Sequence, residues 1–245
     1  MPLLIAGARQ LGFDLSDRQV QQFQLYFETL TDWNSRMNLT AITDLEGVQV
    51  RHFLDSLTAG AALVEELGSA PPEGFRLADI GTGAGFPGVP LKILWPRIAL
   101  SLADSVGKKT TFLRELCAVL GLEGVGVYTA RAEEMGQDRQ HRERYDAVAA
   151  RAVASLPVLC EYCLPLVKVG GSLLAPKKGD ISQEFEETKH VSQVLGGGSP
   201  RLHHFTLPGE EEERVVVAIK KIRATPPGYP RRVGVAKSKP LGARK

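Results

Sequence analysis

Ala-Asp-Ile-Gly-Thr-Gly-Ala-Gly-Phe-Pro-Gly, residues 78–88, is the stretch of sequence that decides the fold. It begins within residues 75–80, an apolar run that predicts a short buried strand, and it precedes a helix. Glycines at positions 81, 83 and 85 allow a tight backbone turn and let a ligand approach without a Cβ in the way. Such a loop at the end of a first strand is where open α/β sheets bind nucleotides.

The spacing of the glycines excludes two familiar nucleotide motifs. A dinucleotide fingerprint needs a third glycine at position 86, where this chain has Phe86. A phosphate-binding loop needs a Gly-Lys-Ser/Thr run, and none follows. By itself the loop also fits a tight turn that binds nothing.

The rest of the chain after residue 75 alternates between strand and helix patterns. Further strands are expected at 98–103, 125–129, 145–150 and 171–175, and helices at 108–120, 156–166 and 181–195. This alternation predicts a parallel α/β sheet. The last two expected strands, 201–207 and 214–220, have no helix between them and predict an antiparallel hairpin at the end of the sheet. The expected fold is therefore a doubly wound, mixed sheet.

The first part of the chain reads as helical. Ser16 and Gln19 form a capping-box signature, and an apolar stripe with helical spacing follows it. A second helix is expected at about 48–67. Gly-Ser-Ala-Pro-Pro-Glu-Gly, residues 68–74, predicts a linker. We expect an N-terminal helical segment at 1–70, a main domain at 71–224 and a C-terminal tail at 225–245.

Composition limits the class of protein. The chain has 245 residues, of which 43% are hydrophobic and 24% charged, which is ordinary for a globular protein. No apolar stretch is long enough to span a membrane, and the start of the chain does not resemble a secretory signal. Three cysteines give no disulfide framework, which favours a cytoplasmic location. Nothing indicates a membrane or protein partner, so we expect a monomer.

Charge is distributed unevenly along the chain. The net charge is +2, but residues 225–245 contain six cations and no acid, leaving 24 cations against 28 acids elsewhere. A basic tail on a mildly acidic body is typical of a protein with an anionic partner, or of a tail that only aids solubility. No core pattern is visible from Thr225 onward.

Two further features follow the next strands of the predicted sheet. Asp104 stands at the end of the second strand, where a carboxylate can accept hydrogen bonds from both ribose hydroxyls. Ala-Arg-Ala-Glu, residues 130–133, comes directly after the third strand, where an acid or backbone group would face an adenine edge. A glycine loop, a ribose acid and an adenine-side acid in this order suggest a nucleoside cofactor without a pyrophosphate, S-adenosylmethionine.

At this point the sequence resembles a known family, the ribosomal small-subunit methyltransferase G family, also called glucose-inhibited division protein B. Residues 79–93 are similar to its first motif, Asp-Ile-Gly-Thr-Gly-Ala-Gly-Phe-Pro-Gly-Val-Pro-Leu-Lys-Ile. Shorter stretches also match: Trp33-Asn34, Met37 to Thr40, Arg51 to Leu57, Asp104-Ser105, Lys108-Lys109, Phe112-Leu113, Arg131 to Glu134, Arg151-Ala152 and Tyr229 to Arg232. The resemblance covers about residues 20–240. Val233 departs from it, because the family more often has proline there.

The resemblance implies a fold and a reaction. The fold would be the Rossmann-like fold of class I S-adenosylmethionine-dependent methyltransferases, with a seven-stranded sheet and an N-terminal helical extension. The reaction would be rRNA methylation, the transfer of a methyl group from S-adenosylmethionine to N7 of guanine 527 in the 530 loop of 16S ribosomal RNA. The implied partner is 16S ribosomal RNA or the small ribosomal subunit.

The resemblance also implies site residues. The expected cofactor contacts are Gly81, Gly83, Phe86, Asp104, Ser105, Val106, Ala132, Glu133 and Arg151. The expected catalytic residues near the target base are Arg151, His52 and Asn38, and the expected RNA contacts are Lys177, Arg231 and Arg232. No metal ligand is expected. Because the basic tail would contact RNA rather than the cofactor, its removal is expected to leave cofactor binding intact.

Methylation of guanine N7 agrees with the absence of two sequence features that other nucleic-acid methylations need. N7 has a free lone pair and no proton to lose, so alignment with the methyl group is the main requirement. Methylation of an exocyclic amine usually comes with an Asp/Asn-Pro-Pro-aromatic run after the fourth strand, where this chain has Ala-Arg-Ala-Val at 150–153. Methylation of a pyrimidine carbon needs a cysteine near that point, but Cys160 and Cys163 belong to the next helix.

Two other functions remain open at this stage. A nicotinamide-dependent oxidoreductase could use the same fold, although Phe86 at the third-glycine position argues against it. A non-catalytic RNA-binding regulator is the other alternative. Several candidates also have ordinary explanations: His52 as a buried structural histidine, Arg151 as an ion-pair partner, and the two cysteines as helix residues without metal or redox use.

Overall fold

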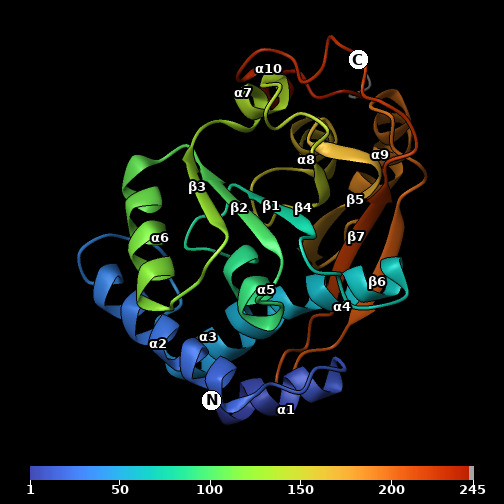
Figure 1. The fold of residues 1–245 in the computed structure, drawn as a ribbon. Coiled ribbons are helices and arrows are strands. Elements are labelled where there is room, and N and C mark those ends of the chain that lie inside the picture. The colour runs from blue at the N-terminus through green and yellow to red at the C-terminus, as the bar shows by residue number, and fades with distance from the viewer. Residues whose placement is uncertain (243–245) are drawn as a thin grey trace.

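The computed structural model describes residues 1–242 as a central sheet covered by helices on both faces (Figure 1). The strands are β1 (Arg76–Ile80), β2 (Ala99–Asp104), β3 (Val125–Thr129), β4 (Tyr145–Ala149), β5 (Val167–Lys178), β6 (Arg201–Phe205) and β7 (Arg214–Lys220). They form one seven-stranded sheet in the order β3-β2-β1-β4-β5-β7-β6. All pairings are parallel except those of β7, which runs antiparallel to both β5 and β6. The predicted mixed sheet and its closing hairpin are confirmed.

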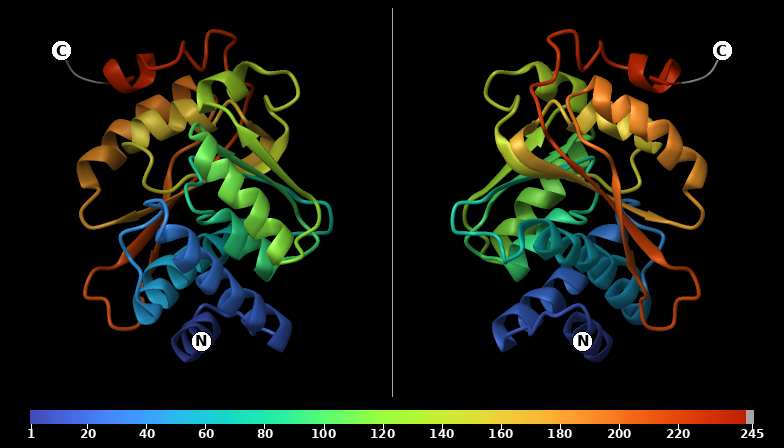
Figure 2. Two further views of the ribbon diagram at one scale, coloured as in Figure 1. Left: turned by 90° about the vertical axis from the view of Figure 1, so that its left-hand side faces the viewer. Right: turned by 90° about the vertical axis from the view of Figure 1, so that its right-hand side faces the viewer.

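Helices pack on the two faces of the sheet and enclose two apolar cores. The N-terminal elements are α1 (Pro2–Gln10), α2 (Asp17–Asn34), α3 (Leu45–Val48), the π-helical turn η1 (Gln49–Leu54) and α4 (Asp55–Leu67). Together with α5 (Gly88–Leu94) and α6 (Gly107–Val119) they cover one face. The other face carries α7 (Ala132–Gln137), α8 (Leu156–Cys163) and α9 (Ser182–Val194), with α10 (Val235–Ser238) against α8 (Figure 2).

Alternating side chains along the central strands pack into the two cores on opposite faces of the sheet. In β1, Leu77 belongs to the core on the α5 side, whereas Ala78 and Ile80 belong to the core on the α8 side. Both faces of the strand are therefore buried, as a parallel sheet with helices on each side requires. Because parallel strands end at the same edge, the carboxyl ends of β1, β2, β3 and β4 come together there.

The capping box expected at the start of α2 is present. The Gln19 backbone N–H donates to Ser16 Oγ at 3.4 Å, and the Ser16 N–H donates to Gln19 Oε1 at 2.8 Å. The Gln19 side-chain amide also donates to the carbonyl oxygens of Ile93 and Leu94, at the end of α5. The same residue therefore starts one helix and satisfies the last carbonyls of another.

Several elements differ from the sequence prediction. Residues 2–10 form a helix that the sequence analysis does not predict, and Leu4 and Ala8 are fully buried. The helix expected at 48–67 starts at Leu45 and contains the π-helical turn η1. Strand β5 is longer than the predicted 171–175 because it pairs with β7 from Ser172 to Lys178. Pairing with a distant strand is not visible in a local pattern.

The C-terminal segment is packed on the body rather than free of it. The absence of a core pattern from Thr225 onward was misleading, because Ala236 is fully buried in the core on the α8 side. Arg244 and Lys245, two of the six tail cations, lie outside the described residues. Within residues 1–242 no helix combines the length and the apolar character that crossing a membrane requires.

Candidate active site

The glycine-rich loop follows β1 and is tied to the end of β2. The backbone N–H groups of Gly81 and Thr82 donate to the carbonyl oxygen of Ala103 at 2.8 and 3.1 Å. Gly81, Gly83 and Gly85 all have positive φ angles, of 67°, 59° and 100°. The predicted tight turn is therefore confirmed, and it uses a backbone conformation that residues with a Cβ rarely adopt.

Gly85 serves helix packing as well as the turn. A Cβ at this position would lie 2.6 Å from the hydroxyl oxygen of Tyr26. That hydroxyl donates a 2.6 Å hydrogen bond to the carbonyl oxygen of Ala84, and the Tyr26 ring stacks on Phe86 with centroids 5.2 Å apart. The N-terminal helix α2 thus supports the loop directly from below.

Asp79 holds the loop from inside the sheet. Its Oδ2 accepts hydrogen bonds from the Thr82 hydroxyl at 2.7 Å and from the Gly88 N–H at 2.8 Å. Its Oδ1 has no hydrogen-bond partner among residues 1–242. Burial raises the pKa of Asp79 to about 6, although the hydrogen bonds from Thr82 and Gly88 act in the opposite direction.

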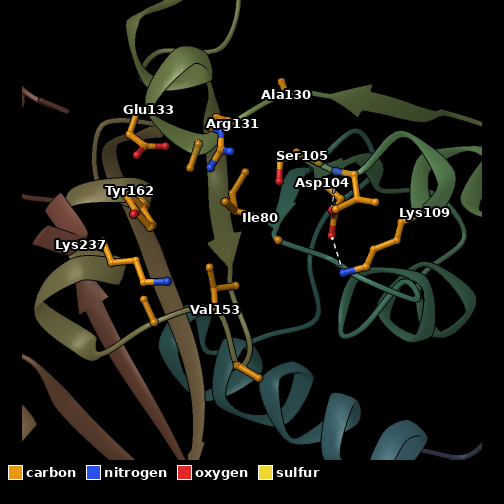
Figure 3. A pocket seen from close by; sticks show the side chains of 16 residues that line it. Ile80, Asp104, Ser105, Lys109, Ala130, Arg131, Glu133, Val153, Tyr162 and Lys237 are labelled. Atoms are coloured by element: carbon orange, nitrogen blue, oxygen red, sulfur yellow. Dashed lines mark hydrogen bonds and ion pairs between the residues drawn. The ribbon is translucent and has the colours of Figure 1, made fainter. Parts of the chain in front are cut away.

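A cleft of about 310 Å³ opens above this loop at the carboxyl ends of β1, β2 and β3 (Figure 3). It is lined by six of the predicted cofactor contacts, Gly81, Asp104, Ser105, Val106, Ala132 and Glu133. Tyr162, Lys237 and the loop after β4 form further parts of the wall. The structure therefore brings together residues that the sequence placed after three successive strands.

The Asp104 carboxylate is fixed at the cleft wall and 6% exposed. Its Oδ2 accepts from the Gly83 N–H at 3.0 Å, and its Oδ1 accepts from the Val106 N–H at 2.9 Å. The Lys109 ammonium lies 3.6 Å from Oδ2. Each carboxylate oxygen has more than one lone-pair site, so further donors can bind from the cleft. Gly83, a predicted cofactor contact, thus orients Asp104 and does not line the cleft.

A second cleft of about 380 Å³ lies on the other side of the loop after β4. Ala152 lines both clefts, and it has a φ of 57°, which is unusual for a residue with a Cβ. The second cleft is mostly lined by charged side chains, which are Arg51, Asp55, Arg151, Lys177, Lys178 and Arg214, together with His52. Two differently built clefts therefore meet at one residue.

Arg151 belongs to the second cleft and is held from two sides. Its Nη1 forms an ion pair with Asp55 Oδ2 and donates weakly to the Arg51 carbonyl oxygen at 3.4 Å. The guanidinium carbon lies 5.1 Å from the centroid of the Phe86 ring. Phe86, predicted as a cofactor contact, is buried beneath Arg151 and lines neither cleft. Its aromatic face supports a cation.

His52 stacks on the same Phe86 ring, with centroids 4.6 Å apart. Its Nδ1 lies 3.0 Å from the Arg51 carbonyl oxygen, and its Nε2 lies 2.7 Å from the Thr40 hydroxyl. A carbonyl only accepts, so the hydrogen is on Nδ1 and Nε2 accepts from Thr40. Burial, assisted by Arg151, lowers the pKa of His52 to about 4. The imidazole is therefore neutral near pH 7, and both its nitrogens are engaged.

The remaining predicted residues are not gathered at the clefts. Asn38 is exposed in the loop after α2 and lines neither cleft. Lys177 lines the second cleft, where it pairs with Glu184 at 2.9 Å. Arg231 forms an ion pair with the buried Glu161, and Arg232 is exposed beside it. An RNA contact by Arg231 or Arg232 stays a prediction.

Sequence reasoning missed the importance of Asp55 and Arg214. Asp55 begins α4, and its Oδ1 accepts from Arg214 Nε at 2.8 Å while its Oδ2 pairs with Arg151. Arg214 also donates to Glu210 at 2.7 Å. Asp55 lies within a stretch that carried the family resemblance, but Arg214 is 159 positions away and no local signal pairs them.

Comparison with known proteins identifies the family of this chain. The family model described as rRNA small subunit methyltransferase G matches residues 19–214. Two relatives with the name "Ribosomal RNA small subunit methyltransferase G" are similar along nearly the whole chain. The one from Exiguobacterium sp. is 48% identical over 241 residues, covering 97% of each chain. The one from Roseiflexus sp. is 49% identical, covering 98% of this chain and all of that one.

A solved structure supports the fold. The CurJ carbon methyltransferase superposes with a TM-score of 0.52 at 16% identity, covering 69% of this chain and 54% of that one. Together with the sheet order, this likeness identifies the Rossmann-like fold of class I S-adenosylmethionine-dependent methyltransferases.

Proposed function

This chain belongs to the rRNA small subunit methyltransferase G family, and on that basis we propose that it transfers a methyl group from S-adenosylmethionine to N7 of a guanine in 16S ribosomal RNA, namely guanine 527 in the 530 loop. The observation that carries the proposal is the meeting of two clefts at Ala152. One cleft suits an adenosyl cofactor and the other suits a base attached to an anionic backbone.

The residues of the first cleft fit S-adenosylmethionine. The fixed Asp104 carboxylate can accept hydrogen bonds from the ribose hydroxyls, and these are charge-assisted. Glu133, which is 6% exposed, lines the cleft, and its carboxylate can accept a hydrogen bond from an adenine amino group. Gly81 lets the backbone pass close to the loop after β4, since a Cβ there would lie 2.4 Å from Val153 Cγ2. When bound, the cofactor supplies a methyl group on a sulfonium.

The second cleft provides alignment rather than proton abstraction. Guanine N7 has a lone pair in the plane of the ring and no proton, so no general base is needed. His52, the nearest candidate base, uses both its nitrogens in hydrogen bonds and has a pKa of about 4. The three cysteines are buried, and none lines either cleft. A cysteine nucleophile has no place in this arrangement.

Arg151 is the residue best placed to align the base. Among its contacts with the described residues, only Nη1 is used, for Asp55 and Arg51. The remaining N–H groups can donate to guanine O6, the edge beside N7, or to a phosphate. Asp55 balances the charge of Arg151, which otherwise would oppose a sulfonium nearby. Arg151 therefore orients the base while its own position is fixed by α4.

The charges around the second cleft favour RNA. Arg51 and Lys178 line it with partly exposed side chains, and their nearest carboxylates, Asp44 and Glu212, lie 3.6 and 3.7 Å away. Lys177 also lines it but is paired with Glu184 at 2.9 Å. Partly exposed cations at a cleft mouth attract a phosphate backbone, and binding then weakens as salt rises.

Mass spectrometry of nucleosides from digested 16S rRNA tests the proposal. Unmodified small-subunit RNA incubated with the protein and S-adenosylmethionine should gain one 7-methylguanosine, and fragment mapping should place it in the 530 loop. A different methylated nucleoside would overturn the assignment of N7. Absence of any methyl transfer, with RNA binding retained, would leave the non-catalytic regulator as the better function.

A further inference from the structure

The C-terminal strap, residues 225–242, is attached to the body by polar contacts as well as by the buried Ala236. The Arg142 guanidinium donates to the carbonyl oxygens of Thr225 and Tyr229 at 2.9 and 2.6 Å. The Lys221 ammonium, fully buried, donates to the Thr225 hydroxyl at 2.6 Å. Buried hydrogen bonds to charged groups are among the stronger ones. The path of the strap is therefore fixed from its start.

A second attachment lies where the strap approaches the cofactor cleft. The Arg231 backbone N–H and Nε both donate to Glu161 Oε1, at 2.9 and 2.8 Å. Arg231 Nη2 pairs with the other oxygen of Glu161, whose side chain is 1% exposed. A two-pronged contact with a buried carboxylate fixes direction as well as position.

Beyond this point the strap reaches the wall of the cofactor cleft. The Gly234 N–H donates to Glu133 Oε1 at 3.0 Å. Lys237, three residues further on, lines the cleft, and Ala236 between them is fully buried. Figure 3 shows Lys237, Tyr162 and Glu133 on one side of the cleft, opposite Asp104 and Lys109. The tail therefore reaches this cleft, and the effect of its removal on cofactor binding stays a prediction.

Glu133 joins the strap to the cleft through its two oxygens. Oε1 accepts the hydrogen bond from Gly234, and Oε2 has no hydrogen-bond partner among residues 1–242. Oε2 is also not among the buried side-chain oxygens that lack a partner, so it is accessible, and Glu133 lines the cofactor cleft as well as a hollow beside Pro230 and Arg231. The hydrogen bond from Gly234 engages one of the two oxygens and fixes the plane of the carboxylate.

We infer that Gly234 is a positioning residue for base recognition in the cofactor site, acting through Glu133. This inference rests on the proposed function, in which the cleft binds the adenosyl cofactor. Glu133 Oε2, held at a fixed angle by the Gly234 N–H, accepts a hydrogen bond from the adenine amino group. A base with a carbonyl at that position would place two acceptors against each other, so the site rejects it.

The conformation of Gly234 makes the inference testable. Its φ is 82°, and a Cβ added there would meet no atom within 4 Å. A valine is strained in this backbone conformation although nothing obstructs its Cβ. Gly234→Val therefore moves the N–H away from Glu133 without a steric clash at Cβ. Gly228→Val is the matched control, since Gly228 lies in the same strap, has the same open surroundings and does not have a left-handed φ.

The experiment is calorimetric titration with S-adenosylhomocysteine and with S-inosylhomocysteine, in which a carbonyl replaces the adenine amino group. Wild type and Gly228→Val should prefer the adenine compound by about tenfold or more, the effect of a hydrogen bond to a charged acceptor. Gly234→Val and Glu133→Gln should each lose most of this preference. A merely structural role for the strap would weaken both ligands equally and leave the ratio unchanged.

The outcomes separate the inference from the proposed function. Binding by wild type with no preference for adenine, or an undiminished preference in Gly234→Val, overturns the inference and leaves the function standing. Failure of wild type to bind S-adenosylhomocysteine and S-adenosylmethionine overturns the proposed function itself. Thermal unfolding identifies a variant that does not fold, and Gly234→Ala, which brings the same conformational conflict with less strain, then replaces Gly234→Val.

Discussion

The two clefts that meet at Ala152 are built in different ways. The cofactor cleft takes most of its wall from loops that directly follow β1, β2 and β3, and each loop lies next to its strand in sequence. The second cleft takes its charged residues from η1, α4, the loop after β4, the end of β5 and the start of β7. Most residues of the first cleft belong to local sequence motifs. The residues of the second cleft come from segments that are far apart in sequence and share no local pattern.

The two clefts also differ in the groups that orient their charged side chains. In the cofactor cleft, backbone N–H groups of Gly83 and Val106 orient Asp104. In the second cleft, side chains orient one another, and Asp55 forms ion pairs with both Arg151 and Arg214. Removing one partner of such a network leaves another charge poorly compensated. We therefore expect cofactor affinity and methyl transfer to respond to different substitutions.

The largest effect is expected for Arg151→Ala. Loss of the group that aligns the base should lower the single-turnover methylation rate by about 100-fold or more, because misplacement of reacting atoms is costly. Cofactor affinity should change little, since Arg151 lines only the second cleft. Arg151→Lys should restore part of the rate, because the charge returns without the planar fork. A large loss of cofactor affinity with a normal rate at saturation would contradict the division between the clefts.

The next effect concerns Asp104→Ala. Loss of charge-assisted hydrogen bonds to the ribose should weaken S-adenosylmethionine binding by roughly tenfold to a hundredfold. The methylation rate at saturating cofactor should fall far less. Calorimetry and single-turnover assays measure the two quantities separately. Unchanged cofactor affinity would remove Asp104 from the ribose site.

A smaller effect is expected for Asp55→Asn. The neutral amide no longer balances Arg151 and Arg214, so the methylation rate should fall by about tenfold, as other coupled positioning contacts do. Cofactor affinity should stay within about twofold of wild type, because the cofactor cleft does not include Asp55. Asp44→Asn is the matched control, since Asp44 also pairs with an arginine, Arg51 at 3.6 Å, but is exposed. Equal behaviour of the two variants would argue against a role for Asp55 in positioning.

The smallest catalytic effect concerns pH. Burial lowers the pKa of His52 to about 4, so the methylation rate should be flat between about pH 6 and 8, where an ordinary histidine titrates. The His52→Gln variant should show the same flat profile, measured by single turnover. A base-dependent limb that disappears in His52→Gln would contradict a mechanism based on alignment alone.

The same histidine gives a stability effect of defined sign. The unfolded state binds a proton at His52 below about pH 6.5, while the folded state does so only below about 4. Stability is therefore lost as pH falls through this window, by about 2 kcal/mol at pH 5. Asp79 has the opposite effect on stability, because burial raises its pKa to about 6, so that its contribution is lost as pH rises. Only the difference in unfolding free energy between wild type and His52→Gln isolates the histidine, and a difference independent of pH would refute the assignment.

Local patterns in the sequence determined the strands, the glycine-rich turn and the acid of the cofactor cleft. The turn at Gly81, Gly83 and Gly85 could be predicted because only glycine adopts such angles freely. Asp104 and Glu133 could be placed because parallel strands end at one edge of a sheet, so that residues after successive strands become neighbours. These inferences depend on backbone geometry over a few residues, which the sequence displays directly.

Tertiary structure alone decided the second cleft and the C-terminal strap. Asp55 and Arg214 meet across 159 positions, and charge attraction between distant residues leaves no periodic trace in sequence. The strap is held by the half-buried Arg142 and by the buried Lys221 and Glu161, through both backbone and side-chain atoms. Phe86 occupies the third-glycine position of a dinucleotide fingerprint, yet its role is to support Arg151 and His52 from beneath. Burial and long-range pairing arise only when folding brings elements that are distant in sequence together on the sheet.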